Sequence, residues 1–147
     1  MDVGLFVPIG NGNANPEVVR AIGRESEARG FESIWVAEHV VLFEDYQSQY
    51  PYDESGKFPG GVDSGILEPL TALTYLAAVT DTIRLGTGIC LVAQRNPVYT
   101  AKQVTDIDNL SGGRARPRPH GHAAVPAELA AAAARGLARA VGRGDLA

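Results

Sequence analysis

Short, almost continuous apolar runs alternate with longer stretches of helical periodicity along the first 114 residues. The apolar runs have the character of parallel strands covered on both faces, and they occupy residues 3–9, 31–37 and 83–92. The stretches in which apolar residues recur at helical spacing occupy residues 15–29, 68–79 and 96–110. Three strand–helix pairs in series predict an α/β protein with a parallel sheet and right-handed connections.

Local signals mark where these helices begin and end. Asn15 and Asn96 are predicted side-chain caps, each followed by a proline that suits the first turn, and the second helix is predicted to begin near Glu68. Gly30 is predicted to end the first helix in the left-handed conformation. The residues expected to face the core are Val18, Ala21, Ile22 and Ala28, then Leu70, Leu73, Leu76, Ala77 and Val79, then Val98, Ala101, Val104, Ile107 and Leu110.

Residues 40–67 form a long polar connection with no clear periodicity. Four aromatic residues, Tyr46, Tyr50, Tyr52 and Phe58, are spread through its glycines, prolines, aspartates and serines. Loops of this length in a compact domain are usually functional or disordered. The aromatic residues favour a lid or substrate loop that packs over a site, with a solvated insertion as the alternative.

A series of parallel strand–helix units belongs either to a closed (β/α)8 barrel or to an open doubly wound sheet. An open sheet that binds a dinucleotide would want three glycines in its first turn, spaced Gly-x-Gly-x-x-Gly. The turn after the first strand, Gly10-Asn11-Gly12-Asn13-Ala14-Asn15, lacks the third. The barrel is favoured on this ground.

Composition narrows the class further. The chain has 147 residues and a formal net charge of -4, and residues 1–114 carry eight basic and fifteen acidic side chains, so no nucleic-acid partner is expected. The single cysteine, Cys90, rules out a disulfide within the chain and is expected to be a small buried hydrophobe. No apolar run approaches the ~20 residues that span a bilayer, and no basic leader opens the chain. The sequence therefore predicts a cytoplasmic protein that does not bind membranes.

Four stretches make the sequence recognisable: RGFESIWVAEHV, YPYDESGKFP, LEPLTALTYLAAVTDTIRLGTGICLVAQRNPVYTAKQ and IDNLSGGR. Together they closely resemble the N-terminal part of the bacterial luciferase-like monooxygenase superfamily, and within it the oxidoreductases that use the deazaflavin coenzyme F(420). The resemblance covers residues 1–114. It implies a TIM barrel that binds FMN or the deazaflavin, acts on a small-molecule substrate, and transfers hydride or activates oxygen.

The resemblance also implies a catalytic residue. Glu38 and His39 match an acidic–histidine pair at the end of the second strand, which in such enzymes lies beside the reactive ring of the cofactor. A histidine can exchange a proton near neutral pH, and the carboxyl end of a barrel strand is where such a group is useful. His39 is therefore the expected catalytic residue. Without the resemblance, a lone histidine that ends a strand is more often structural.

Other positions are matched to the cofactor. Gly88-Ile89 falls on a bulge in the third strand that is often a non-prolyl cis peptide supporting the central ring, with an ordinary strand glycine as the alternative. Phe6 and Thr87 are expected to line the same cavity, and the loop above it carries Arg95 and Asn96. The expected cofactor-binding residues are Phe6, Glu38, Thr87, Gly88 and Ile89.

The family pattern stops at Arg114. Residues 115–147 are rich in alanine, arginine, glycine and proline and contain no aromatic residue. Pro117 and Pro119 cannot donate ladder hydrogen bonds, so a central strand is not expected there. His120 and His122 lack a third ligand, so no metal site is predicted.

The chain is thus divided into residues 1–114, the first three strand–helix units of a truncated TIM barrel, and residues 115–147, a non-family tail. The tail is expected to be disordered or marginally helical over 126–141. A frameshift in a GC-rich gene is the leading hypothesis for it, with truncation or gene fusion as alternatives.

Two functions follow from this division. The lineage is that of a flavin- or deazaflavin-dependent oxidoreductase. The alternative is that this polypeptide is a non-catalytic barrel fragment, inactive as written, whose first and third strands have open edges and which self-associates through them.

Overall fold

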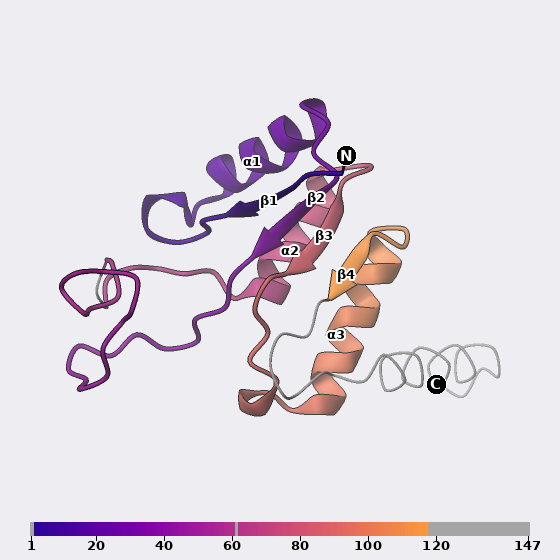
Figure 1. Cartoon of the computed structure of the whole chain (residues 1–147). Coiled ribbons are helices and arrows are strands. Elements are labelled where there is room, and N and C mark those ends of the chain that lie inside the picture. The colour runs from indigo at the N-terminus through magenta and orange to yellow at the C-terminus, as the bar shows by residue number, and fades with distance from the viewer. Residues whose placement is uncertain (1, 61, 118–147) are drawn as a thin grey trace.

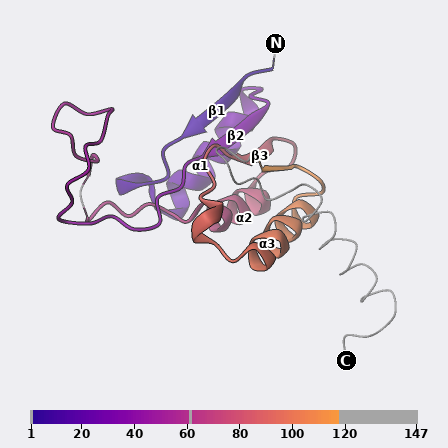
Figure 2. The same cartoon turned by 60° about the horizontal axis from the view of Figure 1, so that its bottom comes forward.

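The computed structural model describes residues 2–60 and 62–117. Within them a parallel sheet runs in the order β1 (Gly4–Val7), β2 (Ser33–Val36), β3 (Arg84–Thr87) and β4 (Ala115–Pro117). Three helices, α1 (Pro16–Ala28), α2 (Pro69–Val79) and α3 (Pro97–Leu110), lie on one side of this sheet (Figures 1 and 2). The predicted α/β class with a parallel sheet is confirmed.

The two faces of the sheet have different surroundings. Leu5, Ile34 and Leu85 are neighbours in the strand register and pack towards the helices, where Ile34 and Leu85 are fully buried. Phe6 and Trp35, also register partners, lie on the opposite face because side chains alternate along a strand. Phe6 is 57% exposed. Among the described residues, therefore, one face of the sheet is covered and the other is open.

The predicted helix starts are confirmed at atomic level. The Asn15 side chain accepts a hydrogen bond from the Val18 amide (2.9 Å), and the Asn96 side chain accepts one from the Val98 amide (3.0 Å). Glu68 caps α2 with its carboxylate. Gly30, past the end of α1, has φ of +76°, the left-handed conformation expected of it.

The inward faces of α1 and α3 differ from the prediction. Val98 and Leu110 are each 70% exposed, and α3 instead buries Thr100 and Thr105 beside its alanine and isoleucine. These threonines tolerate burial because each hydroxyl donates to a backbone carbonyl one turn earlier. In α1 the buried residues are Val19, Gly23 and Ser26, whereas Ala21 and Ala28 are exposed.

The third strand is shorter than predicted. β3 ends at Thr87, and the chain continues irregularly to a short 3-10 helix, η2 (Val92–Gln94). The Leu91 amide donates to the Glu38 carboxylate, so it is satisfied without a neighbouring strand. Cys90 is consequently half-buried in this irregular stretch rather than buried in a strand.

A fourth strand follows Arg114, where the sequence predicted none. β4 pairs with β3 in parallel, with Leu85 opposite Ala115 and Thr87 opposite Pro117. Pro117 is accommodated because this three-residue strand is the outermost of the described sheet, so its backbone has a strand on one side only. The predicted open edge of β3 is therefore wrong, since β4 covers it.

Several predictions fall outside the described residues. They include the helical segment at 126–141, the His120–His122 pair and the character of residues 118–147 as a whole. Within the described part of the chain, none of the helices is both long and apolar enough to cross a membrane.

One carboxylate organises the turn between α2 and β3. Glu27 accepts hydrogen bonds from the backbone amides of Asp81 (3.0 Å), Thr82 and Ile83 (2.9 Å), and from the Thr82 hydroxyl (2.7 Å). Burial alone would raise the pKa of Glu27, but the hydrogen bonds, led by those from Thr82, outweigh it and lower the pKa from 4.5 to about 2.

This low pKa predicts a pH-dependent loss in the Glu27→Gln variant. Because the pKa of Glu27 is lower in the folded chain than in the unfolded one, its contribution to stability is present above pH 4.5 and is lost as the pH falls towards 2. We expect Glu27→Gln to lower the free energy of unfolding by about 1–2 kcal/mol at pH 7. Urea unfolding of both proteins between pH 7 and pH 2 should show this gap closing. Glu25→Gln, in the exposed Arg29 pair, is the matched control and should change stability little.

Candidate active site

A groove of about 470 Å³ opens beyond the carboxyl end of β2, under the segment 40–58. Its walls come from that segment, from His39 and from Leu91 and Gln94 in the connection between β3 and α3. In parallel α/β folds the strand ends converge at this edge of the sheet, and ligands bind there. The groove therefore lies where the strand order predicts a site.

His39 stands at the mouth of this groove. Its ring is exposed and meets the Phe58 ring at a centroid distance of 4.6 Å and an interplanar angle of 70°. Phe58 in turn contacts Tyr50 at 5.2 Å, and Tyr50 contacts Tyr52 at 5.5 Å, all edge to face. An imidazole placed here can exchange a proton with a molecule in the groove.

The aromatic wall is held by contacts within the segment itself. The Tyr46 hydroxyl accepts a hydrogen bond from the Phe58 amide (2.6 Å), and the Lys57 ammonium donates to the Tyr46 carbonyl (2.9 Å) while lying 4.0 Å from the centre of the Tyr46 ring. The Tyr50 amide donates to the Gly56 carbonyl (2.8 Å). These contacts fix residues 46–58 relative to one another.

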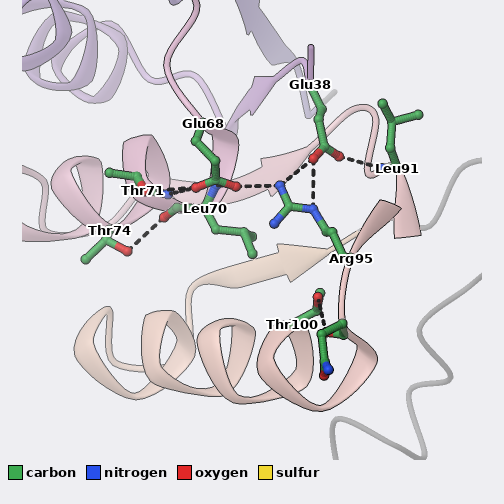
Figure 3. A network of polar contacts seen from close by, with 9 residues as sticks. Glu38, Glu68, Leu70, Thr71, Thr74, Leu91, Arg95 and Thr100 are labelled. Carbon is green, nitrogen blue, oxygen red and sulfur yellow. Dashed lines mark hydrogen bonds and ion pairs between the residues drawn. The ribbon is translucent and has the colours of Figure 1, made fainter. Parts of the chain in front are cut away.

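Glu38, the neighbour of His39, has a different environment. Its side chain is fully buried and forms an ion pair with Arg95, whose Nε donates to Glu38 Oε1 at 2.8 Å (Figure 3). Its other carboxylate oxygen accepts from the Leu91 amide. Arg95 also contacts Glu68 at 2.5 Å, and Glu68 caps α2 through the amides of Leu70 (3.1 Å) and Thr71 (2.7 Å).

The charges of this network stabilise one another. Burial by itself would lower the pKa of Arg95, but hydrogen bonds to Glu38 and Glu68 outweigh it and raise that pKa above its ordinary value. For Glu68 burial acts in the opposite direction and would raise the pKa. The hydrogen bonds from Arg95 and Thr71 outweigh it and lower the pKa of Glu68 below its ordinary value. The network ties the end of β2 to the start of α2 and to the loop before α3. Glu38 and Arg95 are thus joined to the wall of the groove through Leu91, whose amide donates to Glu38.

Two of the predicted cofactor residues come together on the open face of the sheet. A Cβ atom on Gly88 would lie 2.8 Å from Cε2 of Phe6, so a side chain at this position would displace the exposed Phe6 ring from the backbone just after β3. Phe6, Trp35, Gly4 and Gly88 line a hollow of about 680 Å³.

The remaining predicted cofactor residues are placed differently. Ile89 is 41% exposed, and the Gly88–Ile89 bond is trans, as are all described peptide bonds. Thr87 is 1% exposed and lies with Leu70, Leu73 and Leu85 on the helix side of the sheet. Thr87 and Phe6 therefore do not line one cavity, which corrects the prediction. The carboxylate of Glu38 is engaged by Arg95 rather than free at the groove.

Comparison with known proteins decides the lineage. The sequence pattern of luciferase-like monooxygenases matches residues 1–117, three residues beyond the predicted boundary. The chain belongs to the luciferase-like monooxygenase family. The predicted resemblance is confirmed.

Relatives within the luciferase-like family are longer than this chain. An uncharacterised protein of Mycobacterium tuberculosis is 32% identical over 94 residues, which cover 64% of this chain and 33% of the relative. The match thus spans between about a fifth and a third of the length of the curated relatives.

Solved structures of the luciferase-like family share the fold. The coenzyme F(420)-dependent tetrahydromethanopterin reductase of Methanopyrus kandleri matches 80% of this chain and 26% of its own, with a TM-score of 0.56 and 23% identity. The oxygenating constituent of 3,6-diketocamphane monooxygenase from Pseudomonas putida, solved in complex with FMN, matches 84% of this chain and 30% of its own, with a TM-score of 0.59 and 15% identity.

Proposed function

We propose that this chain contributes the first strands of a TIM-barrel oxidoreductase site that uses a flavin or deazaflavin cofactor, with His39 as the proton-exchanging residue. The observation that carries the proposal is the His39 imidazole in the wall of the groove at the carboxyl end of β2. Membership of the luciferase-like family supports it, as do relatives named for coenzyme F(420) or solved with FMN.

The open face of the sheet fits a planar ring. Phe6 presents an exposed aromatic side chain there, and the missing Cβ of Gly88 leaves room beside it. Phe6, Gly88 and the exposed Ile89 are the residues that would hold the ring of the cofactor. When bound, a flavin or deazaflavin supplies hydride transfer, and a flavin can also react with oxygen.

Within the reaction, this chain's residues bind, shield and move a proton. The Phe58 and Tyr50 rings narrow the groove and exclude water from a bound substrate. His39 accepts or donates a proton at the heteroatom bonded to the substrate carbon that loses or gains hydride. Glu38 and Arg95 hold the backbone on either side of the groove and so position His39 and Leu91.

The role of His39 predicts a selective loss of rate. In a chimera that carries residues 1–117 in place of the matching third of an active relative, we expect His39→Ala to lower kcat by about 10²–10⁴-fold, the range typical of a proton-transfer residue. The Kd of the cofactor should change by less than about threefold, because the ring rests on Phe6 and Gly88 instead.

Turnover and cofactor fluorescence titration measure the two effects. Tyr99→Ala is the control, because Tyr99 lies on α3 and is 72% exposed. It should change neither kcat nor the Kd of the cofactor. An unchanged kcat in His39→Ala removes His39 from the mechanism. Failure of the parent chimera to bind either FMN or the deazaflavin contradicts the proposal and favours a non-catalytic role.

A further inference from the structure

The charged groups around the groove are distributed unevenly. Apart from His39, every side chain in the wall of the groove is apolar, aromatic or an uncharged hydroxyl or amide. The apolar part includes Val41, Leu42 and Phe43, and the amides are Gln49 and Gln94. A molecule in the groove therefore meets many apolar atoms and few hydrogen-bonding groups.

Among the described residues, two cations adjoin lining residues of the groove in the sequence, and both are already engaged. Arg95, next to Gln94, has a side chain that is 12% exposed and is paired with Glu38 and Glu68. Lys57 donates to the carbonyl of Tyr46 and lies over the ring of the same residue. Neither cation is among the residues that line the groove, so pairing with a carboxylate, sulfate or phosphate group on a substrate would require each to give up the contacts it already makes.

The segment that covers the groove also has an unfavourable charge for an anion. Between residues 40 and 58 it carries four carboxylates, Glu44, Asp45, Asp53 and Glu54, against the single cation Lys57. None of the four lines the groove, so a cationic substrate would lose its hydration without gaining a paired carboxylate. Both signs of charge are therefore disfavoured, for different reasons.

From this distribution we infer that the substrate of the site is an uncharged, largely apolar ring compound. This inference rests on the proposed function, because it names the substrate class for the same groove. The rings of His39, Phe58 and Tyr50 pack edge to face in the wall of the groove. A planar aromatic ring can add a further edge-to-face contact to such a series, whereas a flexible chain cannot. Phosphorylated and carboxylated metabolites are excluded from the class.

A matched series of probes tests the charge preference on the complete 147-residue chain. The probes are 2-naphthol, 2-naphthoate and 2-naphthyltrimethylammonium, which share a ring system and differ in charge. Binding is followed by NMR through the His39 imidazole signals, assigned by their absence in His39→Ala. We expect the Kd of 2-naphthol to be at least about tenfold lower than that of either ion, which corresponds to the cost of one unpaired charge in a partly solvated groove.

A gain-of-binding variant keeps the test independent of folding losses. Gln94→Lys places an ammonium in the wall of the groove and should lower the Kd of 2-naphthoate by about threefold to tenfold while leaving that of 2-naphthol unchanged. Gln103→Lys makes the same change on the exposed side of α3 and should affect neither probe.

The outcomes separate this inference from the function on which it rests. Equal or tighter binding of either ion by the unmodified chain, or no binding of 2-naphthol, overturns the substrate class. Neither result changes the loss of kcat that is expected from His39→Ala in the chimera. Conversely, an unchanged kcat in that variant, with 2-naphthol preferred, overturns the role of His39 and leaves the preference of the groove for uncharged rings standing.

Discussion

The Arg95→Met variant of this chain should be about 3–5 kcal/mol less stable than the parent, because it leaves the Glu38 carboxylate buried without a counter-ion. Glu38 has a fully buried side chain, and besides its ion pair with Arg95 its carboxylate accepts a hydrogen bond from the Leu91 amide. Glu68 loses its contact with Arg95 as well but keeps its bonds to the start of α2. Urea unfolding followed by the fluorescence of Trp35, the single tryptophan, measures the loss.

Two further variants show whether the loss has this cause. Arg84→Met breaks an exposed pair with Glu32, in which the two side chains are 50% and 27% exposed, and should cost less than about 1 kcal/mol. Adding Glu38→Gln to Arg95→Met removes the unpaired charge while keeping an acceptor for the Leu91 amide, and should restore about 2 kcal/mol or more. Equal losses from Arg95→Met and Arg84→Met would contradict the buried ion pair.

The parts of the fold that were predicted correctly depend on signals a few residues apart. Asn15 and Asn96 cap helices through amides two or three residues later, and Gly30 ends α1 through its own backbone conformation. The end of β2 follows from the same local pattern, since Glu38 and His39 come after its apolar run. The placement of His39 at the carboxyl end of β2 could therefore be predicted from the chain alone.

The parts that were missed depend on partners far apart in the sequence. Arg95 is 57 residues from Glu38 and 27 from Glu68, and no spacing identifies which carboxylates an arginine will reach. The resemblance placed Glu38 beside the cofactor, whereas its carboxylate is hydrogen-bonded to Arg95 and to the Leu91 amide. The Phe58 contact with His39 had only a compositional signal, because residues 40–67 have no periodicity from which a register could be derived.

The predicted inward face of α3 and the predicted lack of a strand after Arg114 were wrong for a different physical reason. A hydrophobic pattern does not count the hydrogen bonds that let Thr100 and Thr105 face inward. The two prolines were taken to exclude a central strand after Arg114, and Pro117 lies in a three-residue strand at the outer side of the described sheet. Both errors arise because the polarity or type of a residue was considered without its hydrogen-bonding partners. These partners decide whether a hydroxyl can be buried and whether a backbone position needs a donor.

Replacement of Arg114 should lower the stability of the fold, since its guanidinium joins the ends of α2 and α3 to the start of β3. It donates five hydrogen bonds, to the carbonyls of Ala77, Thr80, Ile83 and Ser111 and to the Thr80 hydroxyl, at 2.7–3.0 Å. These carbonyls belong to the last turn of α2, the residue before β3 and the residue after α3, where helix ends leave acceptors without partners.

We expect Arg114→Lys to lower the free energy of unfolding by about 2–4 kcal/mol, because a lysine keeps the charge but offers one compact ammonium where the guanidinium forms a planar fork. The effect is measured by urea unfolding at constant pH. Arg29→Lys is the matched control: Arg29 is paired with Glu25 on the surface of α1, with side chains 70% and 65% exposed, and its replacement should cost less than about 0.5 kcal/mol. If Arg114→Lys is as stable as Arg29→Lys, the carbonyls at the end of α2 find other donors, and the guanidinium does not join α2, β3 and α3. A loss seen only in Arg114→Lys would show that the arginine of the Ser-Gly-Gly-Arg turn has a structural role. Its position in the sequence, after two glycines that end a helix, does not predict this role.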